Sequence, residues 1–447
     1  MGKNVDLLRE PIVPALTKLA VPIMATSLVQ MAYNLTDMAW IGRLGAGAVT
    51  AVGTAGLYIW MSQGVVDLAR IGGQVKVAQA LGAGEETEAG EYAKSALHIG
   101  ILLAVLFGTL CRLFSDPLIG IFGLEGQAVI ADSRRYLQIT GGAILFAFLN
   151  AVLTGIFTAA GNSKTSFKAN FIGLVSNMIL DPLLIFGLGP FPVMGVEGAA
   201  IATVTAQMVV TFVFILAAVK DKIIFDKFKF LSAAKWYHIT GIVRVGFPAA
   251  VQRIFMSAVS MVLTRLAASW GDEAVAVQRV GSQIESISWM TADGFGAALN
   301  SFTGQNFGAR QYKRVRDGYA SSVKLAFAWG IFTTALLAGL SVPIFSVFLS
   351  EPDVLAAGND YLKIIAVSQL FMCIEIITSS AFAGLGKTTL PSALSTIFTA
   401  ARIPMAIALS ATALGLNGIW WALTLSSVMK GIILLVCFLF TLRKVGK

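Results

Sequence analysis

The stretch Val21–Trp40, VPIMATSLVQMAYNLTDMAW, has the length of one bilayer-spanning helix and contains a carboxylate, Asp37. Ionisable groups inside such a helix are rare and usually functional. If a neighbouring helix supplied the hydrogen bonds of Asp37, this residue would only fix the packing of the helices. A whole stripe of polar residues favours a cavity instead. Five residues at steps of four, four, three and four form this stripe on one helix face: Pro22, Thr26, Gln30, Tyr33 and Asp37.

The composition indicates a polytopic membrane protein. Of the 447 residues, 56% are hydrophobic and only 13% are charged, and the mean hydropathy is +0.78, far outside the range of soluble globular proteins. The first apolar run is too long for a signal peptide and lacks a small-residue cleavage site, so we expect it to remain as an anchor. The net charge of +9 comes from basic residues that flank apolar segments, which indicates membrane topology and no nucleic-acid partner.

Neither a disulfide framework nor a metal site is indicated. Cys111, Cys373 and Cys437 lie in apolar segments without paired spacing, and we interpret them as small buried hydrophobic residues. The only histidines are His98 and His238, and the chain has no HExxH motif, P-loop or Ser/His/Asp set. We therefore expect neither an enzyme nor a bound cofactor.

Twelve segments are apolar over about 20 residues, the length that spans a bilayer. The second and the eighth carry several charged residues, so they should face protein or a water-filled cavity, because lipid would not accept them. We predict an all-α membrane protein whose twelve transmembrane helices form two six-helix bundles related by pseudo-two-fold symmetry. The segments are centred near Leu28, Met61, Leu103, Ala147, Leu174, Val209, Ala258, Ile287, Ile331, Met372, Phe398 and Leu425.

The two halves of the chain resemble each other. Since six spans is an even number, both halves enter the membrane in the same sense, as parallel repeats that commonly rock around a central site. We predict an N-lobe at 1–219, a cytoplasmic linker at 220–237 and a C-lobe at 238–447. A shift of 226 positions aligns Pro22 with Pro248, Gly45 with Gly271, Asp67 with Asp293 and Gln79 with Gln305, and slightly smaller shifts align Gly161 with Gly386 and Gly195 with Gly415.

The connections between segments alternate in charge. One set, together with both chain ends, holds 20 basic residues. By the positive-inside rule, both termini are expected in the cytoplasm. The opposite set offers little beyond Arg43, Arg112, Arg134, Arg135 and Lys363.

These motifs resemble the multidrug and toxic compound extrusion (MATE) transporters over the whole chain, and most of all their DNA-damage-inducible branch. The resemblance implies a monomer in the bacterial cytoplasmic membrane that exports organic cations in exchange for protons or sodium. No single motif is specific to the family, but the order of the motifs and their occurrence in both halves are. The motifs are the proline and Asp37 of the first segment, the turn at 41–45, Gln-x-x-Gly-Ala at 79–83 and 305–309, Ala160-Gly161-Asn162, and Asn177 to Asp181-Pro182.

The resemblance implies a cation or proton site in the N-lobe. Asn177 and Asp181 are four residues apart and share a helix face. Two acids close together in low dielectric cannot both be charged cheaply, so one is expected to hold a proton. A purely structural role for Asp181, beside Pro182, is the alternative. The implied site is Gln30, Tyr33, Asp37, Asn150, Asn177, Asp181 and Thr203, and the expected substrate cavity includes Asp37, Gln30, Tyr33 and Met31.

The C-lobe departs from the sodium-coupled branch of the family. Those relatives place a glutamate eight residues after the proline of a Gly-x-Pro start, and this chain has Met256 at that spacing from Pro248. Glu375 remains roughly where the family has an acid, and Glu285 and Asp293 are further candidates. The other charges of this half are expected to neutralise one another within the bundle.

The sequence therefore predicts a proton-coupled multidrug antiporter in which Asp37 and Asp181 carry protons. A sodium-coupled antiporter of the same family is the first alternative, because carboxylate and amide oxygens also suit sodium. A lipid-linked-precursor flippase of the same superfamily would need unpaired arginines for a pyrophosphate, and a passive channel is disfavoured by the duplication. The exported compound is not indicated, because multidrug cavities are lined by interchangeable Met and aromatic surface.

Overall fold

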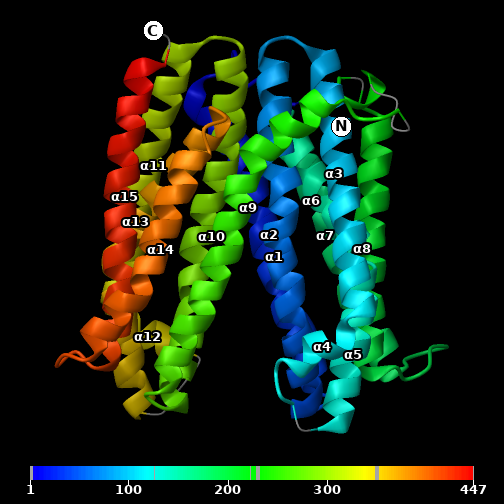
Figure 1. Ribbon diagram of the computed structural model, residues 1–447, viewed down its shortest axis with the longest axis vertical. Coiled ribbons are helices and arrows are strands. Elements are labelled where there is room, and N and C mark those ends of the chain that lie inside the picture. The colour runs from blue at the N-terminus through cyan, green and yellow to red at the C-terminus, as the bar shows by residue number, and fades with distance from the viewer. Residues whose placement is uncertain (1–3, 125, 222, 228–231, 348–351, 446–447) are drawn as a thin grey trace. The chain divides into compact units, whose positions relative to one another are not determined.

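The computed structural model describes residues 4–124, 126–221, 223–227, 232–347 and 352–445 (Figure 1). Contacts divide the chain into two units. Unit 1 comprises Met1–Val5 and Ala25–Ala250, and unit 2 comprises Asp6–Met24 and Val251–Lys447. All regular structure in the described ranges is helical, so the predicted all-α class is confirmed.

Unit 1 is a bundle of long helices in which α2 packs against α3, α5 and α6, while α7 packs against α8. The short α4 lies beside α5 at one end of the bundle (Figure 1). The helices are α1 (Ile12–Gly42, from Ala25 onward), α2 (Ala46–Gly82), α3 (Glu86–Leu113), α4 (Ser115–Gly120), α5 (Gln127–Gly142), α6 (Leu145–Ala159), α7 (Ser163–Phe186), α8 (Gly195–Val219), the 3₁₀ turn η1 (Phe225–Lys227) and α9 (Trp236–Ala268, up to Ala250).

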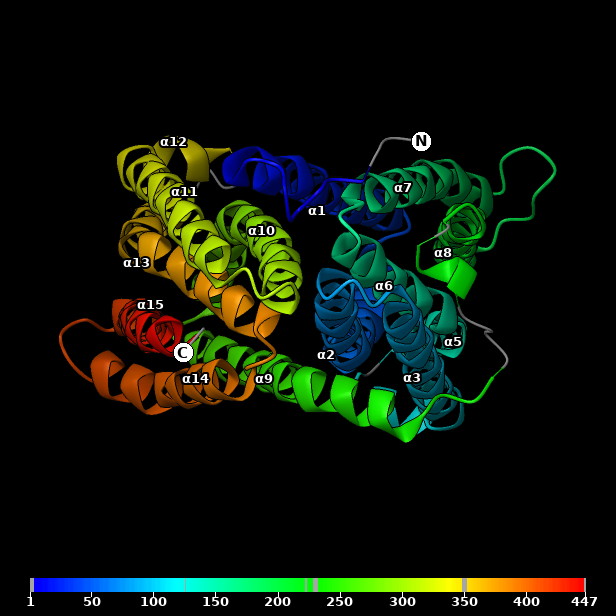
Figure 2. The same ribbon diagram turned by 90° about the horizontal axis from the view of Figure 1, so that it is seen from above.

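Unit 2 is built around one central helix, α13, which packs against α10, α11 and α15 (Figure 2). Helix α14 lies along the outer side of α15. In addition to the remaining parts of α1 and α9, the unit contains α10 (Asp272–Gly308), α11 (Tyr312–Gly339), α12 (Ser341–Ser346), α13 (Pro352–Gly384), α14 (Thr389–Ser410) and α15 (Leu416–Lys444).

The twelve predicted spans are confirmed as helices, since each predicted centre lies inside one. Over the described residues, nine helices are long and apolar enough to cross a membrane, and α5 with α6 makes a tenth that is bent by 45°. This bend divides the fourth span, which the sequence pattern did not indicate. The other two spans are α2 and α10, which are less apolar because they carry the charges noted in the sequence.

The duplication extends to the backbone. Gly45 and Gly271 have φ of 107° and 105°, and Gly195 and Gly415 have φ of 54° and 53°, conformations that favour glycine. Arg310 adopts φ 56° where the first half has Gly84 at 78°. Equivalent turns therefore keep one backbone shape in both units, even where the second copy lacks the glycine.

Close approaches between neighbouring helices occur at equivalent positions of the two halves. A Cβ on Gly198 would lie 2.5 Å from the Leu184 oxygen, and a Cβ on Gly418 would lie 2.6 Å from the Leu409 oxygen. These pairs fix the offset between the halves at 225 for α7 and α14 and at 220 for α8 and α15. Any position of α7 or α8 can therefore be matched to its counterpart in unit 2.

The start of the chain belongs with unit 2 in part because residues of α10 and α11 bind its backbone. Asn306 Nδ2 donates to the Leu7 oxygen at 3.0 Å, and Arg314 Nη2 donates to the same oxygen at 3.2 Å. Residues 6–24 thus join unit 2 rather than the predicted N-lobe.

The start of α9 belongs with unit 1 for a similar reason. His238 Nε2 lies 2.8 Å from Glu88 Oε2 of α3, and Gly246 approaches the Leu68 carbonyl so closely that a Cβ would lie 1.9 Å from its oxygen. The contact units therefore differ from the predicted lobes at both of these helices, and the lobe boundaries stay a prediction. Residues 222 and 228–231 of the predicted linker lie outside the described residues.

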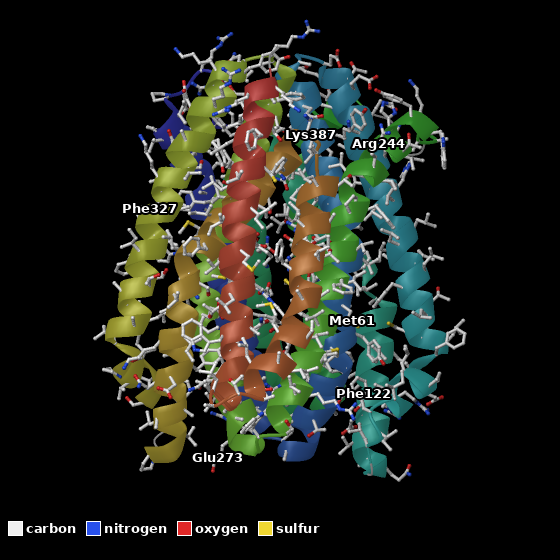
Figure 3. The ribbon with its side chains drawn as sticks, turned by 60° about the vertical axis from the view of Figure 1, so that its left-hand side comes forward. Met61, Phe122, Arg244, Glu273, Phe327 and Lys387 are labelled. Carbon is white, nitrogen blue, oxygen red and sulfur yellow. The ribbon has the colours of Figure 1, made fainter. Side chains whose placement is uncertain are left out.

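Labelled side chains mark the two ends of each unit. In unit 2, Lys387 lies at one end and Glu273 at the other, and in unit 1 Arg244 and Phe122 lie at opposite ends, with Met61 between them (Figure 3).

Candidate functional site

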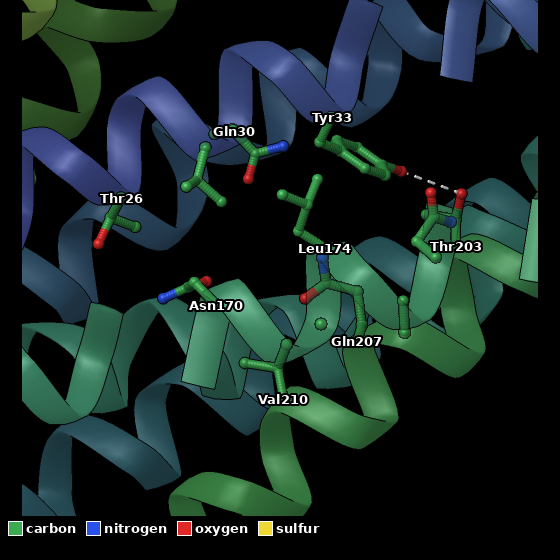
Figure 4. Close-up of a pocket in the computed structure, with 12 residues that line it drawn as sticks. Thr26, Gln30, Tyr33, Asn170, Leu174, Thr203, Gln207 and Val210 are labelled. Atoms are coloured by element: carbon green, nitrogen blue, oxygen red, sulfur yellow. Dashed lines mark hydrogen bonds between the residues drawn. The ribbon is translucent and has the colours of Figure 1, made fainter. Parts of the chain in front are cut away.

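The polar stripe of α1 meets α5, α7 and α8 inside unit 1. The Tyr33 hydroxyl lies 3.2 Å from Thr203 Oγ1 of α8 (Figure 4). The Tyr136 hydroxyl of α5 lies near the same threonine. Because the spacing from Tyr33 to Asp37 is one helical turn, Asp37 follows Tyr33 on the face that meets these helices.

Asp37 and Asp181 form the centre of this site. Their carboxyl groups lie close enough to interact with each other. Asn177, one turn earlier on α7, donates from Nδ2 to Asp181 Oδ1 at 3.2 Å. Asp181 and Asn177 are fully buried, at 0% and 1% exposure. Two helices thus bring together two acids that are 144 positions apart in the chain.

Three acceptor atoms of this cluster lack a donor among the described residues: Asp37 Oδ1, Asn177 Oδ1 and Asp181 Oδ2. A buried acceptor without a donor is costly. Two ionised carboxylates cannot satisfy each other, because both are acceptors, and their charges repel in a medium of low dielectric. One proton turns one carboxyl into a donor and removes the repulsion. The geometry therefore suits a group that takes up a proton or a small cation.

A small pocket opens beside this cluster (Figure 4). The volume open to the centre of a water molecule is about 30 Å³, room for roughly two waters and too small for a drug molecule. Gln30 of α1, Asn170 of α7 and Gln207 of α8 point into it (Figure 4). With Asn177 in its wall, the pocket supplies neutral amide groups next to the acids.

Asn150 holds the far side of the pocket in place. Its Nδ2 donates to Gln207 Oε1 at 2.8 Å, and its Oδ1 accepts from Thr211 Oγ1 at 2.8 Å. Because both ends of the amide are bonded, Asn150 positions Gln207 rather than offering free atoms to a ligand.

The structure brings most of the predicted N-lobe residues together. Gln30, Tyr33, Asn177 and Thr203 line the pocket, whereas Met31 is not in its wall. Asp37 and Asp181 lie beside the pocket and Asn150 lies behind it. Three residues were missed: Asn170, Gln207 and Tyr136. The helical spacing of Thr203, Gln207 and Thr211 could have indicated Gln207, but nothing in the sequence indicates Tyr136.

The candidate acids of unit 2 have different surroundings. Glu375 Oε1 lies 2.9 Å from Lys430 Nζ in a buried ion pair, and it accepts from Ser395 Oγ at 3.2 Å. Glu285 Oε1 accepts from Gln369 Nε2 at 3.1 Å. Asp293 is exposed. Lys430 was not predicted as a member of this cluster.

Comparison with known sequences supports the duplication. The MatE family model matches twice, over residues 22–183 and 248–408. The chain is 30% identical to a probable multidrug resistance protein NorM of Thermotoga maritima, over 95% of this chain and 91% of that protein. It is 28% identical to the probable multidrug resistance protein YoeA of Bacillus subtilis, over 90% and 88%, and 25% identical to a FAD transporter of Shewanella oneidensis, over 84% and 83%.

Solved structures share the fold. The outward-facing conformation of a multidrug resistance MATE family transporter matches with a TM-score of 0.93 at 24% identity, covering 100% of this chain and 99% of that one. A transporter of the MOP superfamily from Pyrococcus furiosus matches with a TM-score of 0.92 at 23% identity, again covering 100% and 99%.

Proposed function

Since this chain belongs to the MATE family of multidrug efflux transporters, we propose that it exports organic cations in exchange for protons, with Asp37 and Asp181 as the proton carriers. The membership makes it a multi-pass membrane transporter. The assignment to the DNA-damage-inducible branch and the monomeric state stay predictions.

The closely placed pair of carboxyl groups, Asp37 and Asp181, carries this proposal. When both protons are bound, the pair is neutral, and when one remains, one carboxyl can donate to the other and the pair carries one negative charge. When both are lost, two facing negative charges remain and attract a cation. Proton and organic cation thus oppose each other through one group, and such a negative coupling acts equally in both directions. Antiport results if the site exchanges a proton for an organic cation when it opens to one side of the membrane and makes the reverse exchange when it opens to the other side.

The amide groups around the acids support the same assignment. Asn177 donates a hydrogen bond to Asp181, and Tyr33 and Tyr136 add hydroxyl groups near the acids. Water in the small pocket beside Asn177 would offer a path for the proton. Gln30, Thr203 and the Asn150-supported Gln207 then position this water.

Sodium coupling is the second candidate, and one observation favours it. Asp37, Asn177 and Asp181 each have a buried oxygen without a donor, and carboxylate and amide oxygens also suit a sodium ion. We place it second because Met256 stands where sodium-coupled relatives carry a glutamate.

We expect export to run without sodium. In proteoliposomes with a fixed pH difference, the rate of ethidium transport should change less than about twofold when potassium replaces sodium, and it should collapse when the pH difference is removed. Loss of transport in potassium buffer would show that sodium is the coupling ion. Proteoliposomes that contain the Asp37→Asn variant give the background rate of ethidium movement without coupled transport.

We also propose that both termini lie in the cytoplasm of a bacterial cell, on the basis of the loop charges. In cells that express a Cys437→Ser background, a cysteine at Glu273 should react with an impermeant maleimide from outside, and one at Lys387 should react only after permeabilisation. Both positions are exposed, and Cys111 and Cys373 are buried. The reversed pattern would overturn the orientation.

A further inference from the structure

The acid pair of unit 1 has polar surroundings on the side at which α1 and α7 begin. The small pocket lies on this side, and Gln30, Asn170 and Gln207 point into it (Figure 4). On α1, Gln30 precedes Asp37 by about two helical turns, and on α7 Asn170 precedes Asp181 by about three. Water in the pocket can therefore approach the acids from this side.

Two aromatic rings lie on the opposite side of the acids. Trp40 follows Asp37 by about one turn of α1, and Phe186 follows Asp181 by about one and a half turns of α7. The two ring centroids are 6.1 Å apart, and the ring planes meet at 72° in an edge-to-face contact. Because contacts advance from the acids to the rings in the same direction on both helices, the ring pair lies beyond the acids, toward the ends of α1 and α7.

The ring pair belongs to an apolar region of unit 1. Trp40 and Phe186 pack against a cluster of buried side chains, most of which have no polar atom. Apolar interiors of this kind stay dry, because water finds no hydrogen-bond partners there. The acids thus lie between a polar pocket and a dry end of the bundle. The members of the cluster from α1, α7 and α8 are Ile41, Ile185, Val196, Ala199 and Ala200.

Arg43 holds the indole of Trp40 from the end of α1. Its guanidinium carbon lies 4.6 Å from the centroid of the indole ring, a distance at which a cation and an aromatic face attract each other. Arg43 is exposed, so it places a positive charge outside the ring. This charge disfavours the approach of a proton or another cation along this side.

Trp40 also has a polar group that complements Asp37. Side chains of a helix lean over the preceding turn, so the indole covers the turn that carries Asp37. Trp40 Nε1 is a buried donor without an acceptor among the described residues, and Asp37 Oδ1 is a buried acceptor without a donor. A tryptophan at this position therefore covers the acid and keeps a donor beside it.

We propose that Trp40 is a lid that closes the acid pair toward the ends of α1 and α7, so that in this conformation a coupling ion reaches the acids only from the pocket. The contacts with Phe186 and Arg43 hold the lid closed. Trp40 binds no proton itself and acts by excluding water from one side of Asp37 and Asp181. The inference rests on the proposed function, because it describes how the coupling ion reaches the same acids.

Proton influx in the absence of substrate tests the lid. Proteoliposomes with a trapped pH-sensitive dye, clamped with potassium and valinomycin, report this influx after external acidification. Wild type should stay tight without ethidium. Trp40→Ala should raise the influx by about tenfold or more, because loss of the indole leaves room for several waters beside the acids. Phe186→Ala, which removes the ring that holds Trp40, should leak as well.

Controls separate a lid from disturbed packing. Trp60→Ala removes an indole that is 49% exposed on α2, and it should stay tight. Trp40→Phe keeps an aromatic ring against Phe186 and should also stay tight. The double variant Trp40→Ala/Asp37→Asn should lose the leak, because the leaking proton passes through the Asp37 carboxyl group.

Three results would overturn the lid. The first is a folded Trp40→Ala that stays tight, and if this variant does not fold, a tight Phe186→Ala has the same meaning. The second is a leak that persists in the double variant, since such protons bypass Asp37. The third is a leak in Trp40→Phe as large as that in Trp40→Ala, because the ring would then not form the seal.

Failure of the proposed function gives a different result. If wild type transports ethidium without moving protons while Trp40→Ala leaks through Asp37, the lid is right and proton coupling is wrong. If wild type exchanges ethidium for protons while Trp40→Ala and Phe186→Ala stay tight, proton coupling is right and the lid is wrong.

Discussion

Replacement of Asp37 by asparagine is expected to abolish coupled export and to return cells to the drug sensitivity of cells without the transporter. The amide keeps the size of the side chain and can donate to Asp181, so the fold should remain intact. It cannot take up or release a proton, however, and it removes one of the two charges that attract a cation. Growth inhibition by ethidium and pH-driven uptake in proteoliposomes measure this loss.

A matched control for this change is Asp116→Asn. Asp116 is an acid of unit 1 that forms an exposed ion pair with Arg134 at 2.7 Å, and surface pairs contribute little to stability. This variant should transport at the wild-type rate. If Asp37→Asn folds normally and still confers resistance, Asp37 only fixes packing and the proposed function is wrong.

Replacement of Asp181 by asparagine is expected to remove the response of transport to membrane voltage. If Asp37 and Asp181 each carry a proton, two protons enter for each monovalent cation that leaves, and one net positive charge moves inward. The voltage then adds about 2.3 kcal/mol per 100 mV, a shift of roughly fiftyfold in the cation gradient. A single proton per cation would move no net charge, and only the pH difference would contribute, at about 1.4 kcal/mol per pH unit.

Proteoliposomes loaded with a monovalent cation and clamped with potassium and valinomycin measure this shift at a constant pH difference. Wild type should respond to voltage, whereas Asp181→Asn should either transport without a voltage response or not transport at all. A wild-type equilibrium that ignores voltage would leave Asp37 as the only carrier. Asp181 would then act as a hydrogen-bond partner that positions Asp37.

The local sequence was sufficient to predict where the helices lie and that the chain is duplicated. Apolar runs of bilayer length predicted helices that contain all twelve centres, because the backbone of such a run must satisfy its own hydrogen bonds. The bend between α5 and α6 was missed, because an apolar run has the same composition whether it is straight or broken. The sequence also did not indicate that the start of α1 belongs to unit 2 and the start of α9 to unit 1. This assignment depends on Asn306, Arg314 and His238, which contact residues far away in the chain.

For the site, the sequence by itself determined which side chains share a face of one helix. The polar stripe of α1 and the spacing of Asn177 and Asp181 follow from helical periodicity, and the resemblance to a family added their common site. Only the tertiary structure decided which faces meet. It brought the carboxyl groups of Asp37 and Asp181 close together, placed Tyr136 near Thr203, and paired Lys430 with Glu375. Periodicity acts over a few residues, whereas the charge and hydrogen bonding of a buried group depend on whichever helix packs against it.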